Sequence, residues 1–177
     1  MKQVYLVLSY TGTMLSKIVR FYTRKEYSHI SISLDKDLKK MYSFGRLNPY
    51  NAFIGGFVHE SLDEGTFKRF YKTETTIYEI DITDEQYEKL LKLINYFEKK
   101  KELFKFNVLG LFAVPLKIKI KRKRYFYCAE FVKYALERSD ISKNLPDIIK
   151  PEDFKNLDNK KIIYKGNMQE YRNYCIN

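Results

Sequence analysis

The segment at residues 28–34 (SHISISL) alternates polar and apolar side chains without a break. Successive side chains of a β-strand point to opposite faces, so the large aliphatic residues of this segment share one face and His29 lies on the other. The aliphatic residues are Ile30, Ile32 and Leu34, and the residues beside His29 on its face are Ser31 and Ser33. A strand with one apolar face is typical of an antiparallel sheet packed against helices.

Further strands and helices are predicted along the whole chain. Apolar or alternating segments indicate strands at residues 3–9, 41–45, 75–82 and 161–164. Helical periodicity indicates helices at residues 15–22, 83–101 and 128–138, and Pro151 opens a short helix. A loop is expected over residues 55–65, which contain three glycines. The pattern predicts an α+β fold, mainly an antiparallel sheet packed against helices, in a single domain at residues 1–177.

The clearest helix start in the sequence is at Thr83. Gln86 follows three residues later, and this spacing forms a capping box in which two side chains satisfy free backbone donors. The apolar stripe that follows has helical spacing and includes Leu90, Ile94 and Phe97.

The sequence contains no pattern for a membrane span, an export signal or a metal site. The longest apolar stretch is near residues 108–116 and includes Pro115, whereas a span needs about twenty apolar residues. The first residues are expected to form a strand rather than a signal peptide, which favours a cytoplasmic location. Cys128 and Cys175 have no partners at metal-ligand spacing, so neither a metal site nor a cofactor is predicted.

Much of the net charge of +11 comes from lysines scattered along the chain, and the one dense cluster is residues 117–124 (KIKIKRKR), here called the basic segment. Its alternating lysines and isoleucines predict a half-buried strand with the lysines on one face, beside the mouth of a cleft at Cys128. A solvated, edge-protecting strip is the simpler interpretation. Contact with an anionic surface is the alternative, and no nucleic-acid partner is expected.

Two residues carry the candidate chemistry. Cys128 is predicted at the first turn of its helix, where the positive end of the helix dipole stabilises a thiolate. His29 has a fixed position on the serine face of its strand, which suits a base. Taken singly, each has a simpler interpretation, a buried apolar-stripe cysteine and a surface histidine. His59 is expected at the surface, and Cys175 is expected to be an unperturbed thiol.

The segments EYSHISISLD and YFYCAEFVKYAL, in this order, resemble the two signature segments of the circularly permuted branch of the papain-like and NlpC-type superfamily. This branch includes YiiX-like proteins and lecithin retinol acyltransferase-like proteins. The resemblance extends more weakly to residues 42–46 and 162–171. It implies a permuted papain-like fold, with Cys128 as nucleophile and His29 as its base.

The resemblance also implies a third polar residue that orients the imidazole, on the strand after His29. Ser43 is the best candidate on that strand, and Glu60 is a more distant carboxylate. Tyr10 is loosely similar to a tyrosine that donates near the oxyanion, although an ordinary aromatic residue at a strand end is the simpler interpretation. The implied activity is thiol-dependent hydrolysis or transfer of an acyl group from a peptide, amide or lipid ester. The alternative is a non-catalytic module that binds anionic surfaces through the basic segment.

Overall fold

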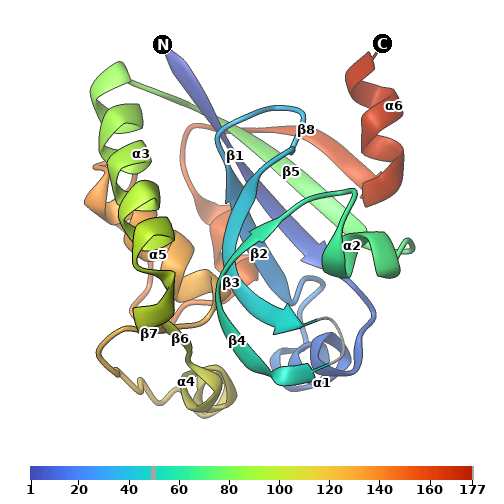
Figure 1. Ribbon diagram of the computed structural model, residues 1–177, viewed down its shortest axis with the longest axis vertical. Coiled ribbons are helices and arrows are strands. Elements are labelled where there is room, and N and C mark those ends of the chain that lie inside the picture. The colour runs from blue at the N-terminus through green and yellow to red at the C-terminus, as the bar shows by residue number, and fades with distance from the viewer. Residues whose placement is uncertain (49–50, 177) are drawn as a thin grey trace.

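The computed structural model of the chain describes residues 1–48 and 51–176, without the side chains of residues 15, 46, 48, 51–54, 175 and 176. Six strands form one antiparallel sheet in the order β4-β3-β2-β1-β5-β8 (Figure 1). Their bounds are β1 Lys2–Tyr10, β2 His29–Ser33, β3 Met41–Asn48, β4 Asn51–Glu60, β5 Glu74–Ile82 and β8 Lys160–Asn167. A separate parallel pair is formed by β6 (Lys105–Phe106) and β7 (Tyr125–Phe126).

Six α-helices and four short 3-10 turns connect these strands in the described part of the chain. The α-helices are α1 Met14–Thr23, α2 Gly65–Arg69, α3 Asp84–Lys99, α4 Val108–Ala113, α5 Cys128–Arg138 and α6 Tyr171–Ile176. The 3-10 turns are Lys101–Leu103, Val114–Leu116, Pro151–Asn156 and Met168–Glu170. The α+β class and the predicted antiparallel sheet are therefore confirmed.

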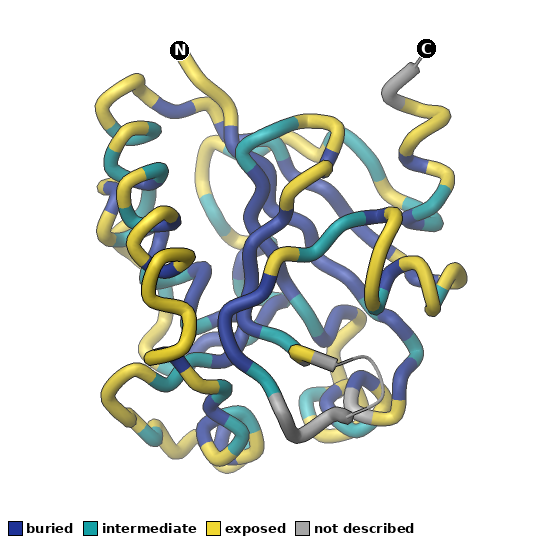
Figure 2. Tube along the Cα trace, viewed as in Figure 1, coloured by how far each residue is buried: buried dark blue, intermediate teal, exposed yellow. Residues whose placement is uncertain are grey.

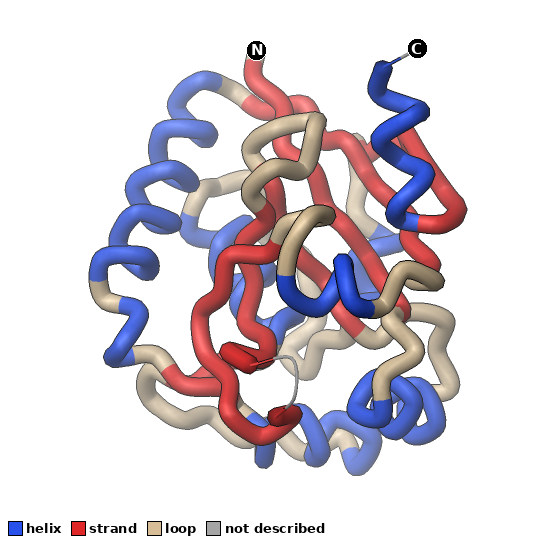
Figure 3. Tube along the Cα trace, turned by 45° about the vertical axis from the view of Figure 1, so that its right-hand side comes forward, coloured by secondary structure: helices blue, strands red, loops and turns tan. Residues whose placement is uncertain are grey.

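The sheet has a hydrophobic cluster on each face. The larger cluster joins the sheet to α3 and α5 and is rich in aromatic rings, including Phe44, Phe57, Phe97 and Phe131. The smaller cluster lies on the opposite face and includes Phe67 of α2 and Tyr171 of α6. Figures 2 and 3 show the buried strands between these helices. Both terminal segments lie at one end of the molecule, and α1 and α4 lie at the other (Figure 1).

The alternation at residues 28–34 has the predicted effect. Ile30 and Ile32 are fully buried in the larger cluster, and Leu34 packs against it. The register pairs Ser9 with His29 and Val7 with Ser31 on neighbouring strands. Cross-strand partners share a face, so the face that carries His29 continues across the sheet.

Two sequence predictions are wrong. Residues 55–60 belong to β4 rather than to a loop, because Gly55 and Gly56 pair with Arg46 and Gly45 of β3. The basic segment is a loop rather than a half-buried strand. It follows a 3-10 turn that contains Pro115, and Lys117 and Arg124 both adopt left-handed backbone conformations, with φ of 57° and 65°. A strand cannot pass through these conformations.

The helix α3 begins at the predicted capping box. The Thr83 hydroxyl accepts from the Gln86 backbone N–H at 3.2 Å, and the Gln86 side chain accepts from the Thr83 N–H at 2.9 Å. The apolar stripe of α3 packs against α5, the helix that begins at Cys128. The cap therefore helps to hold α3 in place, and α3 in turn supports α5.

Replacing Thr83 with alanine should lower the free energy of unfolding by about 1 kcal/mol, because the Gln86 backbone N–H loses the hydroxyl that caps it. Chemical denaturation followed by circular dichroism measures this change. Glu88→Ala, an exposed change on the same helix, is the control and should stay within about 0.5 kcal/mol of the wild type. Equal effects of the two changes would contradict the importance of the cap.

Candidate active site

Cys128 is the first residue of α5, as the sequence predicts. The start of the helix is fixed by Glu130, whose carboxylate accepts from the Tyr127 backbone N–H at 3.1 Å. The Tyr127 hydroxyl donates to the Ile149 carbonyl at 2.9 Å, and the next residue, Ala129, is fully buried. Cys128 is thus held at the positive end of the helix dipole, with only 4% of its surface exposed.

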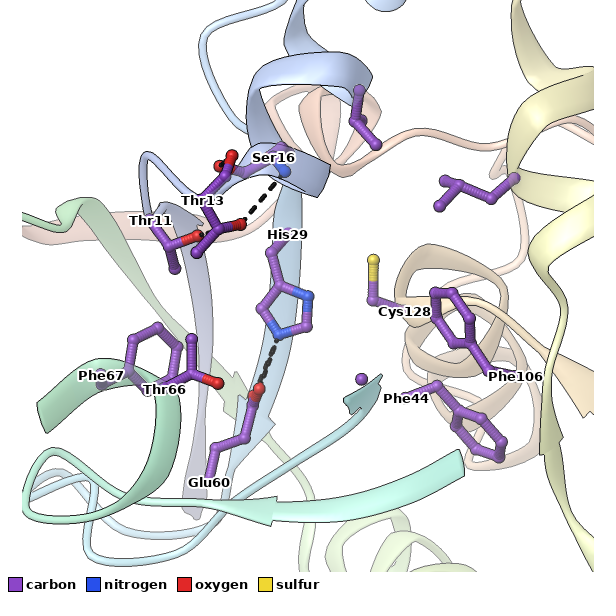
Figure 4. A pocket seen from close by; sticks show the side chains of 14 residues that line it. Thr11, Thr13, Ser16, His29, Phe44, Glu60, Thr66, Phe67, Phe106 and Cys128 are labelled. Atoms are coloured by element: carbon purple, nitrogen blue, oxygen red, sulfur yellow. Dashed lines mark hydrogen bonds and ion pairs between the residues drawn. The ribbon is translucent and has the colours of Figure 1, made fainter. Parts of the chain in front are cut away.

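His29 is the first residue of β2, at the end of the sheet where α5 begins. Its Nε2 lies 3.0 Å from both carboxylate oxygens of Glu60, the last residue of β4. Figure 4 shows the other ring nitrogen on the side of the ring toward Cys128, and Cys128 is one of the groups that raise the pKa of His29. The imidazole therefore lies between a carboxylate and a thiol.

Two serine hydroxyls complete the surroundings of the ring. Ser31 Oγ donates to Glu60 Oε2 at 2.5 Å and lies 3.3 Å from His29 Nε2. Ser43 Oγ also lies 3.3 Å from Nε2, and it donates to the Ile30 carbonyl at 3.1 Å. Both serines are fully buried. They hold the carboxylate and the ring in one hydrogen-bonded group.

Gly45 leaves the space through which Glu60 reaches His29. Glu60 is on β4 and His29 is on β2, with β3 between them. A Cβ atom at position 45 would lie 3.4 Å from Glu60 Oε1 and 3.7 Å from His29 Cε1. A larger side chain would therefore stand between the carboxylate and the imidazole.

The electrostatics of this group favour a protonated imidazole. Burial alone disfavours the charged ring, but the Glu60 carboxylate and the Cys128 sulfur outweigh it and raise the pKa of His29 from 6.5 to about 10. Only 13% of the Glu60 side chain is exposed, so water screens the pair weakly. At neutral pH the ring carries its proton and is attracted to the Glu60 carboxylate.

A small pocket of about 60 Å³ opens at these residues. Its walls come from the loop before α1, from α1 itself, from α2 and from the segment around α4, and they include Thr11, Thr13, Ser16, Val19, Thr66, Phe67, Phe106 and Leu111. The Ser28 side chain also lines the pocket, and its buried hydroxyl has no hydrogen-bond partner among the described residues.

The structure brings together three of the four residues that the sequence singles out for the site. Cys128, His29 and Ser43 meet at the pocket, and Glu60, the alternative third residue, makes the shortest contacts to the ring. Tyr10 lies elsewhere: its ring packs under the Arg20 guanidinium, 4.5 Å from the centroid, and is not part of the described pocket lining.

His59 and Cys175 are the other histidine and the other cysteine of the chain. His59 is largely exposed on β4, and its Nε2 lies 3.2 Å from Glu98 of α3, as expected for a surface residue. The Cys175 side chain lies outside the described residues.

Sequence reasoning missed the roles of Ser28, Ser31 and Gly45. The signal for Ser31 was present, because it shares the polar face of the strand with His29. No comparable signal marks Gly45, since its importance depends on the pairing of β3 with β4.

The described residues contain no group of three or more histidine, cysteine, aspartate or glutamate side chains arranged to hold a metal ion. Of the helices described, none is long and apolar enough to cross a membrane.

Comparison with known proteins gives no family for the chain: no protein-family model matches it, and no curated protein does.

Replacing Glu60 with glutamine should lower the pKa of His29 from about 10 toward its ordinary value near 6.5, because the carboxylate is the main stabiliser of the imidazolium. A raised pKa means that the imidazolium adds its full stability below about pH 6.5, and that this stability is lost as the pH rises through about 10. An NMR titration of the two imidazoles measures the shift, with His59 as the internal control. An unchanged titration of His29 would contradict the role of Glu60.

Proposed function

We propose that this chain is a thiol-dependent acyl hydrolase or acyltransferase with a permuted papain-like fold, in which Cys128 is the nucleophile and His29 its base. The observation that carries the proposal is the position of the His29 imidazole between the Glu60 carboxylate and the Cys128 sulfur. A base held by a third group, with its other ring nitrogen directed toward a helix-start thiol, is the arrangement that nucleophilic catalysis requires.

The residues act in a definite order in this mechanism. The proton resides on His29, and the Cys128 sulfur attacks the carbonyl carbon of the substrate to give a tetrahedral intermediate. The backbone N–H of Cys128, at the start of α5, donates toward the oxyanion. When the carbon–nitrogen or carbon–oxygen bond breaks, His29 protonates the leaving group and a thioester remains on Cys128. Water or an amine then attacks the thioester and returns a proton to His29, and the carbon–sulfur bond breaks to release the acyl product and regenerate the Cys128 sulfur.

Glu60 serves as the orienting group in this proposal. A carboxylate holds the imidazole in one tautomer and stabilises its charged form, and Glu60 contacts Nε2 at 3.0 Å with both oxygens. Ser43 lies farther from Nε2, at 3.3 Å, and directs its hydrogen to the Ile30 carbonyl. It supports the ring position but adds no charge.

The second candidate function is a module that attaches to anionic surfaces without catalysis. The exposed basic segment favours it. It does not account for the buried group of Cys128, His29 and Glu60, since attachment through an exposed loop needs no such group. The two functions are also compatible within one molecule.

Labelling with a thiol-reactive acyl probe at neutral pH should modify Cys128 rapidly. His29→Gln should slow the labelling by about 100-fold or more, because the thiol loses the group that accepts its proton. The chain offers matched controls, since it contains two cysteines and two histidines. Cys175→Ala and His59→Gln should leave the rate unchanged. Labelling that survives Cys128→Ala, or that is as fast in His29→Gln as in the wild type, would refute the enzyme hypothesis.

Comparison of Glu60→Gln with Ser43→Ala tests the identity of the third residue. Glu60→Gln should lower the rate of acyl-probe labelling by about tenfold or more, because the imidazole loses its charge partner. Ser43→Ala should lower it by less than about threefold, since it removes one neutral hydrogen bond. The order of the two effects is the result to measure, and the reverse order would restore Ser43 as the orienting residue.

A further inference from the structure

The outer face of α1 is apolar although it is exposed. Met14 and Phe21 are each 78% exposed, and they lie on one stripe of the helix with Lys17 between them. The apolar periodicity of this helix suggested a stripe that includes Ile18, Val19 and Tyr22, but Tyr22 is 56% exposed. The helix therefore exposes large apolar side chains on its outer side, while Val19 is buried.

The segment around α4 has the same property. Leu109, Phe112 and Leu116 follow one another at spacings of three and four residues, and Leu116 is 70% exposed. Ile118, at the start of the basic segment, is also exposed. A second apolar stripe is thus formed by α4 and the 3-10 turn after it.

The two apolar stripes belong to one end of the molecule. The helix α1 contacts the 3-10 turn that follows α4, and both elements lie at the end opposite the terminal segments (Figure 1). Much of the chain at this end is exposed (Figure 2). Their inner sides line the pocket of Cys128, through Val19 of α1 and Leu111 of α4. The surface formed by α1, α4 and the basic segment is called the docking face below.

The charge of the docking face has one sign. Neither residues 11–25 nor residues 103–129 contain an aspartate or a glutamate. Within the described residues, ion pairs involve neither Lys17 nor the exposed Lys117, Lys121 and Lys123. Lys119 is the exception, because it pairs with Asp147.

The basic segment is held firmly against the start of α5. The Asn107 amide donates to the Ile120 carbonyl at 3.1 Å and to the Glu130 carboxylate at 3.2 Å. Burial raises the pKa of Glu130, and the charges of Lys119 and Lys121 act in the opposite direction, so these lysines lie near that carboxylate. The free lysines therefore project from an anchored loop.

We propose that the docking face binds the surface of an anionic lipid bilayer, so that the pocket of Cys128 opens at that surface. Large apolar side chains interleaved with unpaired lysines match a bilayer interface, where apolar groups enter the acyl boundary and cations contact the headgroups. A nucleic acid would use the cations but would give no reason to expose Met14, Phe21 and Leu116. This binding does not depend on the catalytic proposal.

Flotation of the full chain with vesicles tests the docking face. Vesicles of phosphatidylcholine with added phosphatidylglycerol should bind the protein, and phosphatidylcholine alone should bind it at least about tenfold more weakly. Lys117→Gln/Lys121→Gln/Lys123→Gln and Phe21→Ser/Leu116→Ser should each weaken binding by about tenfold or more. The binding should also decrease with salt, because the Debye length is about 8 Å at physiological ionic strength.

Matched controls separate this face from general charge and hydrophobicity. Lys92→Gln/Lys99→Gln/Lys161→Gln removes the same charge from exposed positions on α3 and β8, and Tyr71→Ser/Ile162→Ser removes exposed apolar side chains elsewhere. Both controls should bind vesicles as the wild type does, and so should Cys128→Ala. A circular dichroism spectrum of each variant verifies that it is folded.

Three results would overturn the proposal. The first is absence of binding to the anionic vesicles, and the second is equal loss in the lysine variant and its matched control. The third is tighter binding to single-stranded RNA than to vesicles, with no effect of Phe21→Ser/Leu116→Ser. Failure of acyl-probe labelling at Cys128 would leave the bilayer result unaffected, so the two proposals fail separately.

Discussion

The contact between Glu60 and His29 depends on the space above Gly45. The two side chains belong to strands that are not neighbours, and β3 runs between them. A Cβ atom at position 45 would already be in van der Waals contact with both groups, so a side chain larger than that of alanine would crowd the carboxylate. Its charge keeps the imidazole protonated, and the ring lies between Glu60 and Cys128. The arrangement of the candidate site therefore follows from the pairing of β3 with its two neighbours.

The aromatic core fixes this pairing from the opposite face of the sheet. Phe44 on β3 pairs with Phe57 on β4, and their ring centroids lie 5.9 Å apart. Both rings also contact Phe97 of α3 and Phe131 of α5. A slip of one residue would turn Phe44 out of this cluster and Gly45 into it. The same packing that stabilises the sheet thus sets the register that the polar group needs, and it positions the helix that carries Cys128.

The sequence predicted the individual helices and strands better than it predicted which strands lie next to each other. Hydrophobic periodicity and the capping box predicted the positions of β2, α3 and α5 well, because those signals depend on residues close together in the sequence. The strand β4 was missed because Gly55 and Gly56 indicate a loop when they are considered alone, whereas here they allow close approach of the backbones. A Cβ at Gly55 would lie 2.5 Å from the Gly45 carbonyl oxygen, a contact that no local pattern reveals.

The same distinction applies to the candidate site. Cys128 and His29 could be found from a helix start, a strand face and a resemblance, all of which depend on nearby residues. The choice between Ser43 and Glu60 could not be made, because it depends on how far a long side chain reaches across an intervening strand. The basic segment was assigned to a strand because its alternation has the right period. Left-handed conformations at Lys117 and Arg124, set by the preceding turn and by the return to β7, prevent that strand from forming.

The size of the pocket connects the candidate chemistry with the docking face. A space of about 60 Å³ is far smaller than the 300–1,000 Å³ or so that small-molecule sites typically occupy. An acyl substrate must therefore either present little more than its carbonyl end or separate the pocket walls. Val19 and Leu111 contribute to those walls from α1 and α4, the two helices whose outer faces are apolar and exposed. Insertion of Phe21 and Leu116 into a bilayer would act on α1 and on the segment around α4, which are the elements that narrow the pocket. Binding at the outer face would therefore also affect access to Cys128.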